Sequence, residues 1–177
     1  MADEGALDRW IDKLDIRELV ERSVRAIDDQ DPAAFADLFE EDGVLQLAGT
    51  VFAGQDALRV MFGGGSGDPG WIEPGRLLVQ PGSMHLTGNV VIDVDGDVAT
   101  AETDMVTLVR GDDGRSRITL LARYRDRLRR GPDGRWRLRS RTGVSLGVPD
   151  EVGTDAEWSR ALARMPDELR AVFRPDG

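Results

Sequence analysis

The chain has 177 residues, of which 40% are hydrophobic and 32% charged, and its formal net charge is -10 at pH 7. This length fits one domain with a sizeable core, and the chain has no apolar run long enough to span a bilayer. With no cysteine, one histidine and a single lysine, Lys13, it lacks the residues for a disulfide, a cysteine nucleophile, a sulfur zinc site or a metal site built on several imidazoles.

The first predicted element is an amphipathic helix over about residues 8–29, because apolar residues recur there at three- and four-residue steps. Asp28 ends this buried stripe, which also contains Ser23. A carboxylate directed toward an apolar interior loses hydration and therefore needs a partner. The alternative is that Asp28 is solvated at the helix end or caps the following turn.

Shorter elements are predicted next. Asp31 and Pro32 resemble an N-cap followed by proline at the first helical position, which predicts a second helix that ends at Asp42 and Gly43. A short extended piece over 44–47 and a third helix around 57–61 follow, and then a glycine-rich loop over 63–70.

Four long strands are predicted over 84–94, 98–110, 118–129 and 136–146, where the hydrophobic period changes to two. Hairpin signals separate them and indicate an antiparallel meander. A capping box of Thr154 and Glu157 predicts a last helix through Met165. Helices first and a sheet afterwards predict one α+β domain over 1–177, with its core at about 8–146, in which the helices cover one face of the sheet.

His85 is the only side chain of the protein whose unperturbed pKa, about 6.5, allows it to take and give a proton near neutral pH. Strict alternation directs it away from the apolar face of its strand. Gly88, however, is typical of a β-bulge, and one extra residue there would place His85 and Thr87 on the face of Ile92. The alternative is a structural or surface histidine.

Several segments, in this order and spacing, resemble the SnoaL-like branch of the NTF2-like superfamily, which includes scytalone dehydratase, bile-acid dehydratase, a hexachlorocyclohexane dehydrochlorinase and polyketide cyclases. The resemblance covers about residues 8–146. It is carried by the segments DIRELV at 15–20, AIDDQD at 26–31, FADLF at 35–39, DGV at 42–44, FAG at 52–54, MHLTGN at 84–89, DGDVATA at 95–101, RYRD at 123–126 and GRWRL at 134–138.

The resemblance implies a cone-shaped α+β fold: three N-terminal helices packed on a strongly curved, mostly antiparallel sheet, plus a C-terminal helix. It implies a mostly apolar pocket in which Asp28 orients His85 as general acid/base. The implied function is a cofactor-independent dehydratase, isomerase or cyclase acting on a hydrophobic small molecule, such as a polyketide or steroid-like compound. The alternative is a non-catalytic ligand-binding or assembly subunit, similar to the β subunit of ring-hydroxylating dioxygenases. Family members assemble as dimers or trimers, so a homo-oligomer is expected.

Four further residues are candidate substrate contacts. Tyr124, the only tyrosine, shares the even-numbered face of its strand with Ile118 and Leu128 and could donate a hydrogen bond or simply fill the core. The resemblance adds Asp104 and Arg141, although alternation places Arg141 beside Arg137 and Arg139 on an outward face. It also adds Ser23, which stands where the dehydratases often have a tyrosine.

Other signals are discounted. The aspartates over 93–104 lack the glycine and glutamate of an EF-hand, so no metal is expected, and the glycine-rich loop lacks the lysine of a phosphate-binding loop. Neither a nucleic-acid nor a membrane partner is expected, and the acidic start of the chain favours a cytoplasmic protein over a secreted one. The arginines over 123–129 and 137–141 are interpreted as a solvated or subunit-facing sheet surface.

Overall fold

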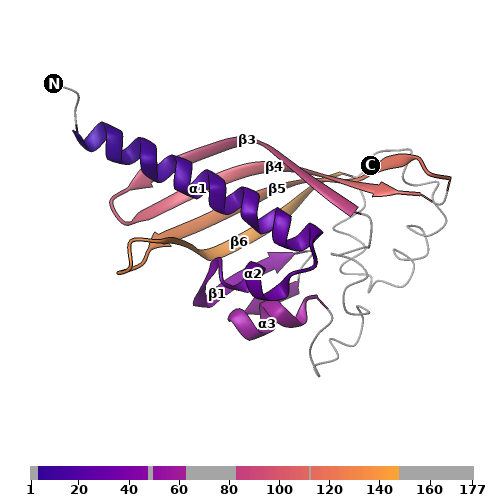
Figure 1. Ribbon diagram of the computed structural model, residues 1–177, viewed down its shortest axis with the longest axis horizontal. Coiled ribbons are helices and arrows are strands. Elements are labelled where there is room, and N and C mark those ends of the chain that lie inside the picture. The colour runs from indigo at the N-terminus through magenta and orange to yellow at the C-terminus, as the bar shows by residue number, and fades with distance from the viewer. Residues whose placement is uncertain (1–3, 48–49, 63–82, 112, 148–177) are drawn as a thin grey trace.

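A computed structural model describes residues 4–47, 50–62, 83–111 and 113–147, which form three helices and one six-stranded sheet (Figure 1). The elements in chain order are α1 (Glu4–Asp28), α2 (Pro32–Ala36), β1 (Phe39–Leu47), β2 (Thr50–Ala53), α3 (Gln55–Val60), β3 (Ser83–Asp95), β4 (Val98–Arg110), β5 (Ser116–Arg130) and β6 (Trp136–Gly147). The predicted last helix and the glycine-rich loop lie outside the described residues.

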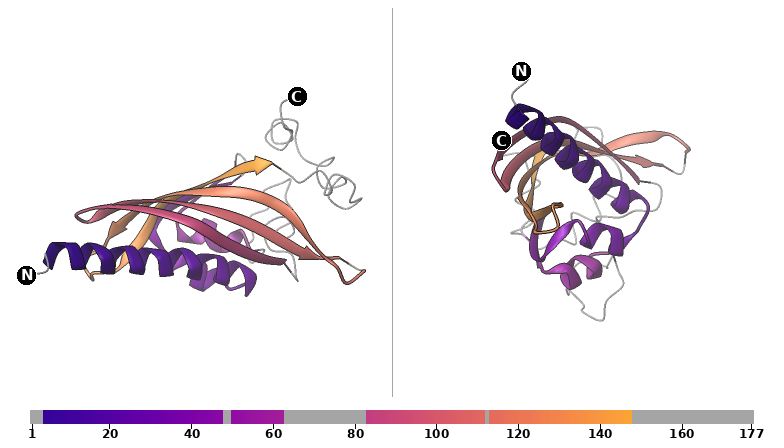
Figure 2. Two further views of the ribbon diagram at one scale, coloured as in Figure 1. Left: turned by 90° about the horizontal axis from the view of Figure 1, so that it is seen from above. Right: turned by 60° about the vertical axis from the view of Figure 1, so that its left-hand side comes forward.

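The sheet has the order β2-β1-β6-β5-β4-β3. The predicted meander is confirmed, since β3 to β6 pair antiparallel in sequence order, whereas β1 joins β6 in parallel and makes the sheet mixed. The long strands curve, and α1 lies along one face of the sheet (Figure 2). We call this face the inner face and the opposite one the outer face.

The core fills the space between the inner face and the helices. The stripe of α1 is buried from Ile16 to Ile27, and the ring of Phe35 in α2 lies 5.2 Å, centroid to centroid, from that of Phe39. Burial of these side chains holds α1 on the sheet and thereby fixes where its last residue, Asp28, lies. No helix within the described residues is long and apolar enough to cross a membrane.

The second helix is shorter than predicted, and β1 starts earlier. Asp31 does cap α2 by accepting a hydrogen bond from the amide of Ala34, but Phe39 already pairs with Leu138 of β6. Pairing with a distant strand thus overrides the local helical pattern. Gly43 lies in β1 at an irregularity of this pairing, where a Cβ would come within 2.9 Å of the Glu40 carbonyl oxygen. The strand β2 was not predicted at all.

A buried polar cluster attaches the first half of α1 to the sheet. The carboxylate of Asp12, 5% exposed, accepts hydrogen bonds from Arg130 at 2.7 Å and from the indole of Trp136 at 3.1 Å. The guanidinium of Arg130 also lies 4.8 Å from the centroid of the Trp136 ring. Asp12 thus accepts from both the indole N–H and a terminal guanidinium nitrogen, which offsets the cost of burying its carboxylate.

Replacing Asp12 with alanine is expected to lower the free energy of unfolding by about 1–3 kcal/mol, because the Trp136 N–H and part of Arg130 would lose their acceptor while remaining largely buried. Urea unfolding followed by tryptophan fluorescence measures this loss. The exposed Asp15 of the same helix provides the control, and Asp15→Ala should change stability by less than about 0.5 kcal/mol. Equal losses for the two variants would contradict the assigned role of Asp12.

Candidate active site

Asp28 and His85 meet on the inner side of the sheet, where α1 ends beside the start of β3. The imidazole Nδ1 lies 2.6 Å from one carboxylate oxygen, and the two side chains are 7% and 14% exposed for His85 and Asp28 respectively. The backbone amide of His85 also donates to both oxygens of the same carboxylate, at 3.1 and 3.2 Å. One carboxylate therefore fixes both the strand and the ring of the histidine.

The predicted bulge in β3 is confirmed and explains why His85 faces inward. Gly88 pairs with Asp104 and Val91 with Glu102, so two residues of β3 stand opposite one residue of β4. The left-handed backbone occurs at Asn89, with φ of 50°, rather than at the glycine. The extra residue reverses the alternation, so the ring of His85 and the buried Ile92 lie on one face.

The contact constrains the proton positions on the imidazole. An ionised carboxylate only accepts hydrogen bonds, so the neutral ring satisfies it best with its proton on Nδ1. Nε2 then carries the lone pair, and no hydrogen bond joins Nε2 to any residue that the structure describes. In this arrangement Nε2 can accept a proton from a bound molecule while Asp28 stabilises the charged ring.

A second buried polar group lies on the same face, nearer the middle of the sheet. Arg141 donates to Asp126 through Nε at 2.8 Å and through a terminal nitrogen at 2.7 Å, and both residues are almost fully buried. Its other terminal nitrogen donates to the hydroxyl of Ser23 at 2.6 Å, and that hydroxyl donates to the carbonyl of Val20. Burial alone would lower the pKa of Arg141, but the charge and hydrogen bonds of Asp126 outweigh it, and the pKa lies above its usual value.

The prediction that Arg141 faces outward is wrong. Leu128 pairs with Leu138 and Arg127 with Ser140, so Arg139 is an extra residue that shifts every later residue of β6 by one. The shift turns Arg141 inward. Arg141 and Ser23, both expected to contact substrate, are bonded to each other and to the protein in the structure.

Tyr124 lies on the inner face, 4% exposed, with its ring 4.4 Å from the guanidinium carbon of Arg141. Gly143 stands opposite it on β6, and a Cβ there would clash with the side chain of Leu47 and come within 3.5 Å of the Tyr124 ring. Burial raises the pKa of the phenol; Arg141 counteracts this in part, while the charges of Asp126 and Asp28 add to it. The hydroxyl thus keeps its proton as a possible donor.

As the only tyrosine, Tyr124 reports its own ionisation in the ultraviolet spectrum. In the unfolded chain the phenol should ionise near its ordinary pKa of 10.0, whereas the folded protein should show less phenolate absorbance at that pH because burial raises the pKa. Because the folded pKa is raised, the associated stability is complete below pH 10 and is lost as the pH rises through the folded pKa. A spectrophotometric titration in buffer and in denaturant measures both values, and half-ionisation of the native protein at pH 10 would contradict the burial.

The structure does not bring Asp104 to the dyad. Its neighbours Thr103 and Met105 are buried on the inner face, which places Asp104 on the outer face. There it accepts from Arg123 at 2.6 Å and from Asn89 at 3.0 Å, and these hydrogen bonds, that of Arg123 first, lower the pKa of the carboxyl. The expectation that Asp104 contacts substrate finds no support in this position.

Asp126 is the residue near the site that the sequence reasoning missed. It stands two residues after Tyr124 on the even-numbered face of β5, among apolar side chains, and it is 2% exposed. An acidic residue within an apolar alternation was the available signal, since a buried carboxylate requires a cation or several donors.

Comparison with known proteins places the fold in a family. The family model of the SnoaL-like domain matches residues 8–142. An NTF2-like protein with a cystatin-like fold from Novosphingobium aromaticivorans is 25% identical, with 99% of both chains covered and a TM-score of 0.70. A search of curated proteins found no match.

Two enzyme-like structures share the fold at lower identity. A hexachlorocyclohexane dehydrochlorinase from Novosphingobium barchaimii is 17% identical, with a TM-score of 0.63 over 81% of this chain and 92% of that one. A proposed scytalone dehydratase from Novosphingobium aromaticivorans is 21% identical, with a TM-score of 0.61 over 80% and 89%. The family model covers well over half of the chain, and the curved sheet with its helices agrees with these neighbours, so the chain belongs to the SnoaL-like family of the NTF2-like superfamily.

Proposed function

We propose that this protein is a cofactor-independent acid/base enzyme that acts on a hydrophobic small molecule through His85 and Asp28. The observation that carries the proposal is the 2.6 Å contact between His85 Nδ1 and the Asp28 carboxylate in a largely buried setting. This arrangement suits a base whose second nitrogen must remain available.

In the proposed reaction, Nε2 of His85 removes a proton from the carbon next to a substrate carbonyl, and the C–H electron pair forms an enolate. The ring becomes positively charged, and the Asp28 carboxylate stabilises that charge. The same proton can then return to a leaving β-hydroxyl, which departs as water, or to another carbon, which moves the double bond. If the enolate carbon instead attacks a second carbonyl, the proton goes to the new alkoxide and a ring closes.

The fold relatives support chemistry of this kind, because a dehydrochlorinase and a proposed dehydratase both remove a small leaving group. Tyr124 is the proposed donor to the substrate carbonyl, since its phenol keeps its proton on the same inner face as His85. Ser23 and Arg141 support this arrangement through the hydrogen bond that joins α1 to β6. Substrate contact by these two residues is not part of the proposal.

Exchange of α protons tests the proposal without knowledge of the substrate, because all three reaction types begin with the same step. A panel of hydrophobic ketones and β-hydroxy ketones, some with fused rings, would be incubated with the protein in deuterium oxide and followed by proton NMR. We expect catalysed loss of the α signal for at least one member, and a lack of exchange in every ligand that binds would contradict the proposal.

The alternative, a ligand-binding or assembly member of the family, predicts a different outcome of the same experiment. Line broadening of a panel member without α exchange indicates binding alone. If no member of a structurally wide panel shows either broadening or exchange, the result favours the assembly role. The experiment therefore tests the proposed base and ligand binding by separate signals.

A further inference from the structure

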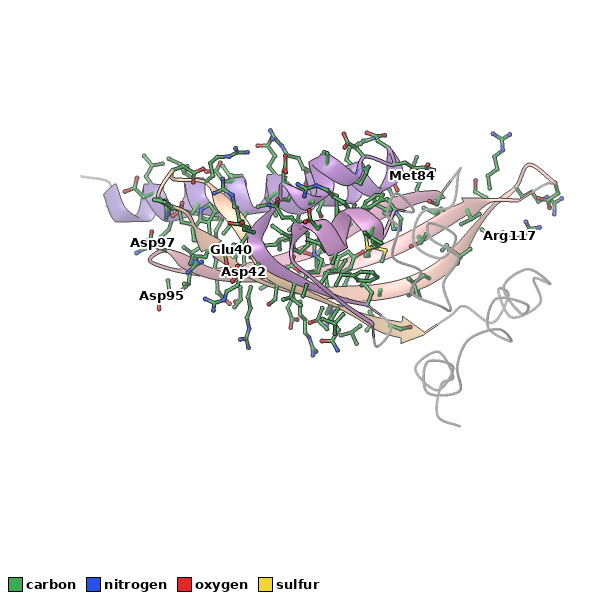
Figure 3. All side chains as sticks on the ribbon, turned by 90° about the horizontal axis from the view of Figure 1, so that it is seen from below. Glu40, Asp42, Met84, Asp95, Asp97 and Arg117 are labelled. Atoms are coloured by element: carbon green, nitrogen blue, oxygen red, sulfur yellow. The ribbon has the colours of Figure 1, made fainter. Side chains whose placement is uncertain are left out.

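The first part of β3 could pair with β4 in two ways, and the protein adopts the one that the apolar residues of the strand oppose. Met84 and Asp95 lie toward the two ends of this strand (Figure 3). After the bulge, Val91 pairs with Glu102, and the pairs up to Asp95 continue in the same register. Without the extra residue, residues 83–88 would all shift by one position on β4 and turn to the opposite face.

The register without a bulge would suit the apolar residues of this segment. Met84 and Leu86 are 54% and 53% exposed on the outer face. Without the bulge both would turn inward, and Leu86 would take the place opposite Thr107 that His85 occupies. His85 would then pair with Leu108 on the outer face. Because burial of apolar surface is favourable, Met84 and Leu86 favour this register. Some other feature of the strand therefore holds the bulge in place.

Asn89 lies within the bulge and has an uncommon backbone conformation. Its φ of 50° is in the left-handed region, which asparagine adopts more readily than other non-glycine residues and in which a β-branched residue is strained. The exposed side chain donates to Asp104 at 3.0 Å, and Asp104 also accepts from Arg123 at 2.6 Å. Asn89 is thus suited to this conformation by its residue type, and its amide is held on the outer face.

Gly88, the residue that marked the bulge in the sequence, has neither a positive φ nor a close approach that would require glycine. A Cβ at Gly88 would meet no atom within 4 Å. The register also shifts at Thr119 of β5, which turns Ile118 outward, away from the face predicted for it, and at Arg139 of β6. Within the strands that the structure describes, however, Asn89 is the one residue with a positive φ. The bulge in β3 therefore depends on Asn89 in a way that the other two do not depend on any residue.

We propose that Asn89 is a positioning residue for His85: its left-handed backbone fixes the bulge, and the bulge places the imidazole beside Asp28. This role of Asn89 rests on the proposed function, in which His85 is the base, but the position of the ring can be measured on its own. Asp28 acts in the same direction, because its carboxylate binds the ring and the backbone amide of His85 where the strand turns them inward. An exposed asparagine on the outer face thus decides whether the base faces the inner one.

Two substitutions of Asn89 separate the backbone conformation from the hydrogen bond. Both lose the bond to Asp104, but glycine adopts the left-handed region freely, whereas the strain of valine there should change the ratio of the two registers by about tenfold or more. Because His85 is the only histidine, its Hε1 signal needs no assignment, and a soluble paramagnetic agent broadens this signal where the ring is exposed. We expect one protected signal in the wild type and in Asn89→Gly, and a second, accessible signal in Asn89→Val. The rate of α-proton exchange in Asn89→Val should fall to the fraction of molecules that keep the protected signal.

A second substitution should reverse the effect of the first. Leu86→Thr removes an apolar side chain that favours the register without a bulge, so Asn89→Val combined with Leu86→Thr should return to one protected signal. Gly88→Ala should behave as the wild type, since a Cβ meets nothing there. A single protected signal in Asn89→Val, an accessible one in Asn89→Gly or Gly88→Ala, or failure of Leu86→Thr to restore the ring would each overturn the role of Asn89. If the ring moves as expected but α-proton exchange does not follow it, the proposed function is overturned and the role of Asn89 in placing His85 is supported.

Discussion

Replacing His85 with glutamine is expected to reduce α-proton exchange in the responsive ketone by about 100-fold or more, the contribution that a positioned general base makes. Glutamine retains a polar side chain of similar length but has no group that takes up a proton near neutral pH. NMR exchange rates at saturating ketone measure the loss in the catalytic step, while line broadening shows whether binding persists. Full activity of His85→Gln would contradict the role of this residue.

The partner carboxylate has its own test. Asp28→Asn keeps the shape of the side chain but removes the charge, and its amide can donate to Nδ1 and favour the wrong tautomer. We therefore expect a large fall in the exchange rate with little change in ketone binding. The adjacent Asp29 is exposed and provides the matched control, so Asp29→Asn should exchange at the wild-type rate. An unchanged melting temperature for both variants separates chemistry from folding.

The second large effect concerns stability. Asp126→Ala is expected to lower the free energy of unfolding by about 3–5 kcal/mol, because it leaves the guanidinium of Arg141 buried without a counter-charge. Denaturant unfolding measures it. Asp133 pairs with Arg137 in the same two-bond manner, at 2.9 and 2.7 Å, but on an exposed hairpin. Asp133→Ala should therefore lose only a small part of what Asp126→Ala loses.

A double variant distinguishes burial of charge from simple loss of packing. Asp126→Leu combined with Arg141→Met removes both charges and fills similar volume, so it should recover most of the stability lost in Asp126→Ala. If the double variant is less stable than Asp126→Ala, the unpaired charge is not the cause of the loss. Retention of α-proton exchange in a stable double variant would show that this pair only supports the site.

The elements that the sequence predicted well are those whose local pattern agrees with their tertiary setting. The four long strands have turn residues at each end, and the amphipathic stripe of α1 made an inward Asp28 one of two interpretations, between which the family resemblance decided. Gly88 marked the bulge that directs His85 inward, even though Asn89 takes the unusual backbone conformation. The residue pattern left both members of the dyad with two interpretations, and the family resemblance predicted their pairing.

What the sequence did not reveal depends on pairing between distant strands. The start of β1 at Phe39 follows from its parallel pairing with β6, and nothing local marks it. The bulge at Arg139 contains no glycine or proline, so strict alternation placed Arg141 on the wrong face. An extra residue in one strand changes the face of all that follow, and this is why the buried Arg141–Asp126 pair was not predicted.

The most direct test of the central claim is the tautomer of the single imidazole. Long-range nitrogen–proton NMR correlations of uniformly ¹⁵N-labelled protein report which ring nitrogen carries the proton, at a pH where titration of the same signals shows the ring to be neutral. The 2.6 Å contact predicts a protonated Nδ1 and an unprotonated Nε2, and a different tautomer balance in Asp28→Asn. A neutral ring protonated on Nε2 in the wild-type protein would contradict the proposed base.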